Sequence, residues 1–172
     1  PANAPINDLV AARLGRERDE GGALAAAGVP DEAVLTQFLA HPYFYKMPPK
    51  SLDRNDFASL SAAVAGLSDA DAAATLTAAA AAAVAKGAEH FPVPVSKLLV
   101  TGGGRHNGAL MQALALHFSQ VVAIDAQGLN GDMLEAQAFA YLAARVQAGL
   151  PTSSPQTTGV PRATIGGQIT RP

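Results

Sequence analysis

The chain has 172 residues, of which 49% are hydrophobic and 15% charged, with no cysteine and a formal net charge of −2. This length predicts one domain or one lobe of a larger protein, and the apolar content is enough to build a core. The absence of cysteine excludes disulfide, thiolate and Cys-ligated metal sites. The charge provides no attraction to nucleic acid or anionic lipid, so we expect no nucleic-acid or membrane partner.

The longest apolar run lies near residues 78–85 and is too short to cross a bilayer. Residues 1–10 lack the basic start of a signal peptide. These two observations predict a cytoplasmic protein. The chain begins with Pro1 and not with Met, which indicates a piece of a longer polypeptide.

Residues 1–91 predict a mainly helical segment. Apolar side chains recur at helical spacing over residues 6–14, and a short helix is expected over residues 20–27. A further helix is expected to begin at Asp31 and to end before Pro42, since the residue before a proline is pushed out of the helical region.

The proline-rich stretch 42–54 predicts an extended loop outside the core. A helix over residues 55–67 should follow it, with Asp53 and Asp56 placed as a cap. Ser68 then indicates the start of a long helix that runs to about residue 87. Its run of alanines favours both the helical conformation and close packing against a neighbour.

Residues 92–172 predict a β-α-β nucleotide-binding segment followed by a tail. The expected order is a strand at 97–100, a glycine loop at 101–107, a helix at 108–118 and a strand at 121–124. A crossover of this length implies that the two strands are parallel.

A loop at 125–131 should lead into a helix over residues 133–148. Asp132 and Glu135 have the spacing of a capping box for that helix. A weak late strand is expected at 164–169.

The triple glycine Gly102–Gly104 is the strongest local signal. A loop between a buried strand and a helix is where open α/β sheets bind ligands, and the first N–H groups of the helix favour a phosphate. The spacing fits neither the dinucleotide fingerprint nor the P-loop. A tight turn without a ligand remains an equal alternative, and Asn107 could bind a ligand or cap the next helix.

Lys50, Ser51 and Arg54 cluster beside two prolines, which suits an anionic or sugar ligand. A surface loop packed by its own aromatic side chains is an equal alternative. Glu135, in the first turn of a helix, is either a carboxylate that faces a cleft or a group favoured by the helix dipole, and the second interpretation is favoured. The spacing of the histidines gives no metal site, so no metal ligand is expected.

A series of motifs follows the whole chain in order. They are PANAPIND (residues 1–8), DEGGALA (19–25), HPYF (41–44), PPKS (48–51), TGGGRHN (101–107) and EAQAFAYLA (135–143). Leu150-Pro151 and Thr158-Gly159 complete the series. This series resembles the carboxyl-terminal half of the anhydro-N-acetylmuramic acid kinase family.

The resemblance implies the actin/Hsp70/hexokinase-like superfamily. We therefore expect an α/β chain, the helix-rich carboxyl-terminal lobe of an actin-like ATPase fold (ribonuclease H-like) with a small sheet. ATP and Mg²⁺ are the implied cofactors, and 1,6-anhydro-N-acetylmuramic acid is the implied substrate. The family opens and phosphorylates this sugar to N-acetylmuramic acid 6-phosphate in cell-wall recycling. A carboxylate activates water to attack the anomeric carbon, while the sugar O6 takes the γ-phosphoryl group.

The resemblance also implies roles for single residues. By position, Gly102, Gly103, Gly104 and Asn107 bind the nucleotide. Glu135 is the implied catalytic residue, which helps to place the water or the sugar. Lys50 and Ser51 match the sugar-end loop of the family, beside Arg54.

The sequence departs from the family pattern in informative places. The general-base Asp would lie just before Pro1, and the first phosphate loop would lie in the amino-terminal half. Leu52-Asp53 stands where Thr-Gly is usual, and Ala2 stands where a Gly is usual. We therefore expect a missing amino-terminal lobe as partner, no kinase activity for the chain alone, and an exposed face that a homodimer could cover. An ATP-binding chaperone-like or regulatory module of the same superfold is the alternative, and an inert interaction domain is a third.

Overall fold

The computed structural model describes residues 3–52 and 54–170, without the side chains of Arg54 and Asn55. The helices are α1 (Ala4–Leu14), α2 (Ala23–Ala26), α3 (Glu32–Leu39), α4 (Ala58–Ala63), α5 (Asp69–Ala88), α6 (Gly108–Ala115), α7 (Leu134–Gln147) and α8 (Pro155–Thr158). The strands are β1 (Leu98–Val100) and β2 (Val121–Ala123). The 3-10 turns are η1 (Glu20–Gly22), η2 (Pro42–Tyr45), η3 (Arg54–Phe57), η4 (Gly103–His106) and η5 (Ile124–Gln127).

Helix α5 is the centre of the body. Ser68 caps it by accepting a hydrogen bond from the Asp71 backbone N–H at 3.1 Å, as the sequence predicts. Helices α1, α2, α3 and α6 pack around it, and Ala72, Ala79 and Ala81 of α5 are fully buried. The small alanine side chains let four neighbours approach one helix, so the predicted tight interface is confirmed.

The prediction that residues 42–54 lie outside the core is wrong in part. Residues 42–45 form η2, and Phe44 is buried in the main core cluster between α1, α3, α4 and α5. The Phe44 ring lies 5.1 Å from the Phe38 ring and 5.6 Å from the Phe57 ring, measured between centroids. Burial of large aromatic side chains outweighs the local preference of a proline-rich segment for an exposed loop.

The predicted β-α-β unit is confirmed. Strands β1 and β2 are parallel, with Leu98 opposite Val121. Helix α6 joins them and contributes Leu110 and Leu114 to a second core cluster, which Phe118 and residues of α5 complete. The fold is therefore α/β, helix-rich with a two-stranded parallel sheet.

Three predicted elements differ in extent. Helix α4 begins only at Ala58, after η3, and Asp53 of its predicted cap lies outside the described residues. Helix α6 ends at Ala115, since the chain turns there to bury Phe118 and to enter β2. The late strand at 164–169 is absent, and the described chain shows there a single antiparallel bridge between Ser153 and Thr164.

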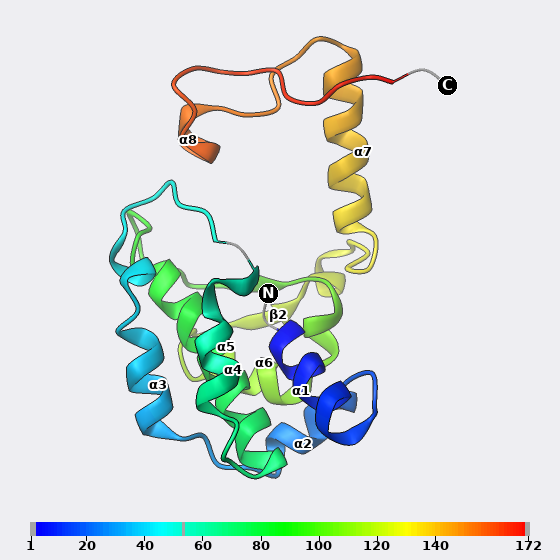
Figure 1. The fold of residues 1–172 in the computed structure, drawn as a ribbon. Coiled ribbons are helices and arrows are strands. Elements are labelled where there is room, and N and C mark those ends of the chain that lie inside the picture. The colour runs from blue at the N-terminus through cyan, green and yellow to red at the C-terminus, as the bar shows by residue number, and fades with distance from the viewer. Residues whose placement is uncertain (1–2, 53, 171–172) are drawn as a thin grey trace.

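Helix α7 and the residues after it form an arm that leaves the body (Figure 1). The helix rises away from the sheet, and the tail then folds over the top of the body toward the loop that follows η2. Arg145 ties the tail to α7, since its Nε donates to the Pro151 carbonyl at 2.6 Å. No residue of α7 is buried, which sets this helix apart from α5 and α6.

Candidate functional site

The glycine loop follows β1 and presents its backbone to open space. Gly102 has φ +67°, a conformation that favours glycine. A Cβ added at Gly102 or at Gly103 would meet no atom within 4 Å, whereas one at Gly104 would lie 3.2 Å from Leu110. The first two glycines therefore leave room for a ligand to approach the backbone closely, as a phosphate does.

Asn107 is a buried residue at the end of this loop, and it fixes the start of α6. It is only 5% exposed, and its Oδ1 accepts a hydrogen bond from the Leu110 N–H at 3.0 Å, which caps α6. Its Nδ2 lies 3.4 Å from Asn3 Oδ1. The turn at Gly22 covers it so closely that a Cβ there would lie 2.1 Å from Asn107 Oδ1. Of the two sequence alternatives, capping is confirmed, and direct contact with a nucleotide stays a prediction.

A mostly apolar cavity of about 300 Å³ adjoins the glycine loop. Its walls are β1, Gly104 of the loop, Leu110 and Leu114 of α6, and Ala80 and Val84 of α5. An apolar hollow beside an open backbone loop is the shape of a site that holds a flat organic group and an anion together. The sequence did not indicate this cavity, because it forms only where α5, β1 and α6 pack together, and spacing along the chain does not fix that packing.

Arg105 ties the glycine loop to the segment that leads into α7. Its Nε donates to Asp125 Oδ2 at 2.7 Å, and its Nη1 donates to Asp132 Oδ1 at 2.7 Å. These hydrogen bonds hold the pKa of both carboxyl groups below the ordinary value of 3.8, and they raise the pKa of Arg105. The predicted capping box is wrong, because Asp132 binds Arg105 and α7 has no side-chain cap at Met133.

The chain just before α7 contacts the same loop. The Gly131 carbonyl accepts hydrogen bonds from the Gly102 N–H at 3.1 Å and from Thr101 Oγ1 at 3.0 Å. Glu135 stands four residues further on and is exposed. The helix that carries the predicted carboxylate therefore begins at the glycine loop, and the role of Glu135 stays a prediction.

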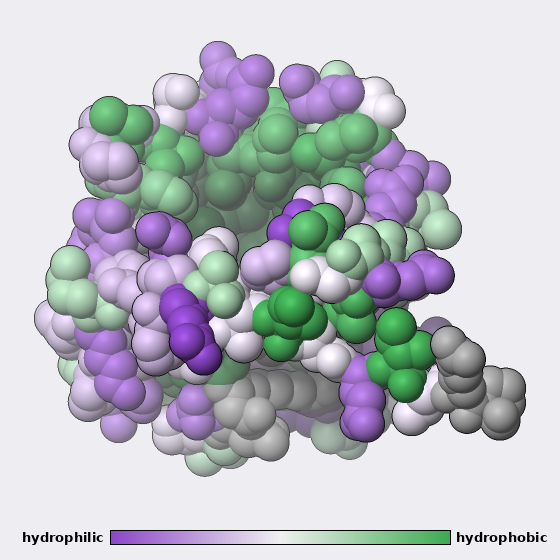
Figure 2. All heavy atoms as spheres, turned by 90° about the horizontal axis from the view of Figure 1, so that it is seen from above, coloured by the Kyte–Doolittle hydropathy of each residue, from purple (hydrophilic) through white to green (hydrophobic). Residues whose placement is uncertain are grey.

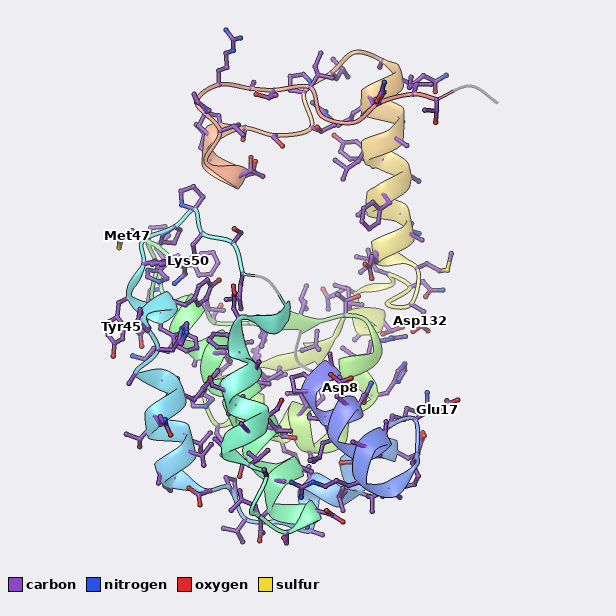
Figure 3. All side chains as sticks on the ribbon, in the orientation of Figure 1. Asp8, Glu17, Tyr45, Met47, Lys50 and Asp132 are labelled. Carbon is purple, nitrogen blue, oxygen red and sulfur yellow. The ribbon has the colours of Figure 1, made fainter. Side chains whose placement is uncertain are left out.

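The predicted sugar-binding residues lie elsewhere. The Lys50 ammonium donates to the carbonyls of Tyr43 at 3.1 Å and Phe44 at 3.4 Å, and it lies 3.1 Å from His90 Nε2. Ser51 is exposed, and the side chain of Arg54 lies outside the described part. Figure 3 shows Lys50 and Asp132 on opposite sides of the body. The structure thus does not bring the Lys50 loop and the glycine loop into one cluster.

A larger cavity, of about 390 Å³, lies between α1, α4, α5 and η2. Aromatic side chains and Leu52 line it, together with Asp8 of α1. Leu52 belongs to the segment after Lys50, so this loop borders the cavity through its apolar residue. The sequence analysis did not select Asp8 as a site residue, because a single carboxylate on a helix does not indicate that it lines a cavity.

Among the described residues, no group of three His, Cys, Asp or Glu side chains could hold a metal ion. In that part of the chain no helix is long and apolar enough to span a membrane.

The anhydro-N-acetylmuramic acid kinase family model matches residues 1–172. The chain belongs to this family. A protein of Cereibacter sphaeroides named anhydro-N-acetylmuramic acid kinase is 68% identical over the whole of this chain, which covers 47% of that protein. Proteins of the same name from a Ruegeria species and from Acidiphilium cryptum are 59% and 51% identical, and 46% and 48% of each is covered. The chain thus spans about half the length of the curated relatives it matches.

Proposed function

We propose that this chain is the carboxyl-terminal part of an ATP-dependent kinase that converts 1,6-anhydro-N-acetylmuramic acid to N-acetylmuramic acid 6-phosphate. The family match over residues 1–172 carries this proposal, and the open glycine loop supports it. The parallel β-α-β segment fits one lobe of an actin-like ATPase. Because it would use ATP, this kinase would act in the cytoplasm, and its role there would be cell-wall recycling.

The chain's own residues would contribute backbone donors and one carboxylate. The loop Gly102–Gly104 holds the nucleotide phosphates, with the N–H groups of Gly103 and Gly104 as donors because that of Gly102 is bonded to the Gly131 carbonyl, and the apolar cavity beside the loop takes the base. Mg²⁺ would be held chiefly by the phosphates, as is usual for this ion. It supplies charge neutralisation of the transferred group. Glu135, at the head of α7, helps to place the water or the sugar, and the general-base Asp belongs to the amino-terminal half.

Two surfaces support the need for that amino-terminal half. Strand β1 pairs with β2 alone in the described sheet, and an open strand edge is normally covered. Helix α7 is rich in apolar residues on all its sides, yet Phe139 is 64% exposed and Tyr141 is 61% exposed. A helix of this composition is normally buried. Figure 2 views the molecule from above and shows apolar side chains gathered around a hollow on that face.

The relatives have enough additional length to cover both surfaces. We expect the isolated chain to be inactive and to associate with itself through them. Co-expression with the amino-terminal half of the Cereibacter sphaeroides relative should give a soluble complex. That complex should release ADP when Mg-ATP and the anhydro-sugar are present.

A pair of charge-matched variants tests the loop. Gly103→Asp places a negative charge at the open backbone, where an added Cβ meets no atom within 4 Å. Gly66→Asp adds the same charge at an equally open position in the turn between α4 and α5. We expect Gly103→Asp to abolish Mg-ATP binding in a calorimetric titration of the complex, and Gly66→Asp to leave it unchanged. Equal affinities for the two variants would contradict the proposed site.

A further inference from the structure

Arg105 belongs to the glycine loop, but its side chain binds the segment between β2 and α7. It is only 3% exposed. Its two carboxylate partners, Asp125 and Asp132, stand near the two ends of the segment that joins β2 to α7. Arg105 therefore fastens both ends of this segment to the loop.

Backbone contacts reinforce the same junction. Arg105 Nη1 also donates to the Gly102 carbonyl at 2.8 Å, and the Gly102 N–H donates to the Gly131 carbonyl at 3.1 Å. A Cβ at Gly131 would lie 2.5 Å from Arg105 Nε, so the guanidinium needs a glycine there. The loop and the base of α7 are thus connected through both side chain and backbone.

The position of α7 depends on this junction more than that of an ordinary packed helix. The helix buries no residue, so packing against the body contributes little to its direction. We propose that Arg105 is a positioning residue that holds the nucleotide loop and the first turn of α7 as one unit, so that a nucleotide on the loop also orders α7. The part that concerns the nucleotide rests on the proposed function.

A guanidinium beside a phosphate loop could instead bind the phosphate itself. In this structure the donors of Arg105 are engaged by Asp125, Asp132 and the Gly102 carbonyl. A bidentate contact with a phosphate would require some of these hydrogen bonds to break, and the side chain is only 3% exposed. The charge of Arg105 is also offset by the two carboxylates, which favours the positioning role.

Hydrogen exchange of the nucleotide-free chain tests the junction. In Arg105→Met we expect amide exchange to rise about tenfold or more in both segments 101–107 and 128–136, and to stay unchanged in α5. Arg105→Lys should restore part of the protection, since it keeps the charge but loses the fork that bridges two carboxylates. Arg105→Met with faster exchange in 101–107 alone would overturn the proposal.

Arg13→Met is the matched control. Arg13 is a second partly buried arginine, which binds Asp69 and the carbonyls of Val64, Ala65 and Leu67. Its loss should speed exchange near residues 64–70 and leave both junction segments unchanged. If Arg105→Met speeds exchange in α5 as well, Asp132→Ala replaces it as the test, since it removes the carboxylate that accepts from Arg105 Nη1. This variant keeps the pair with Asp125 and cuts the tie to α7. Unchanged exchange in 128–136 would then overturn the proposal.

Mg-ATP provides the readout that a purely structural role would not affect. In the wild-type chain, nucleotide should slow exchange in both 101–107 and 128–136. In Asp132→Ala it should still slow exchange in 101–107 but no longer in 128–136. Equal protection of both segments in this variant would refute the coupling. If nucleotide slows exchange nowhere in the wild type, nucleotide binding by the chain alone fails. The nucleotide-free experiment still decides the role of Arg105.

Discussion

Replacement of Gly22 by alanine should destabilise the protein strongly. The new Cβ would lie 2.1 Å from Asn107 Oδ1 and 2.8 Å from the Ala109 backbone N. Three costs combine at this position. The backbone has φ +79°, which costs about 1–2 kcal/mol for a residue with a Cβ. Displacement of the Asn107 cap costs about 1 kcal/mol. Overpacking against α6 costs about 1–3 kcal/mol.

The sum is about 3–6 kcal/mol, which approaches the whole stability of a small domain at about 5–15 kcal/mol. Gly21→Ala is the matched control, since Gly21 has φ +64° but an added Cβ meets nothing within 4 Å. Only the backbone cost of about 1–2 kcal/mol should then apply. Urea unfolding of the wild-type chain and both variants measures the difference. Free energies of unfolding that agree within about 0.5 kcal/mol for the two variants would refute the reasoning.

Three further outcomes follow from other contacts. Lys50→Met should lower Tm by about 2–4 °C, because the bonds of the ammonium to the η2 carbonyls are lost, whereas Lys46→Met at an exposed position should not. Arg105 lowers the pKa of Asp132 below its unfolded value of 3.8, so this pair stabilises the fold above that pH and the effect fades as pH falls through the lowered pKa. The wild type should therefore lose more stability between about pH 5 and about pH 3 than Arg105→Met does. Phe139→Glu should weaken binding of the amino-terminal half about 10–100-fold without destabilising the chain alone, as size-exclusion titration would show.

Several features could be predicted because their partners are close along the chain. Ser68 and Asn107 each cap a helix by accepting a hydrogen bond from an N–H three residues later. Asp31 does the same for α3, where its carboxylate accepts from the Val34 N–H at 2.9 Å. The parallel pairing of β1 and β2 follows from the length of the crossover between them. In each case the sequence contains both partners within one local segment.

The failed predictions share the opposite property. Asp132 has capping-box spacing, but its carboxylate accepts a hydrogen bond from the buried guanidinium of Arg105, 27 residues earlier, and does not cap α7. Phe44 follows a proline in a loop-like stretch, but the rings of Phe38 and Phe57 give it a place in the core. The contact between Lys50 and His90, which follows α5, likewise joins residues far apart in the sequence, and the role of Lys50 toward a ligand stays a prediction.

The amino-acid order alone thus specifies the helices, the strand–loop–helix–strand unit and the family, since these depend on short-range propensity and on motifs that can be matched in order. Folding in three dimensions sets which charged groups meet and which apolar surfaces remain open. The ion pairs of Arg105 with Asp125 and Asp132 require the folded chain, in which β1 and β2 lie side by side. The exposure of α7 is likewise a property of the folded chain. The physical reason is that side-chain hydrogen bonds and apolar burial depend on distance in space, which spacing along the chain constrains only over about one helical turn.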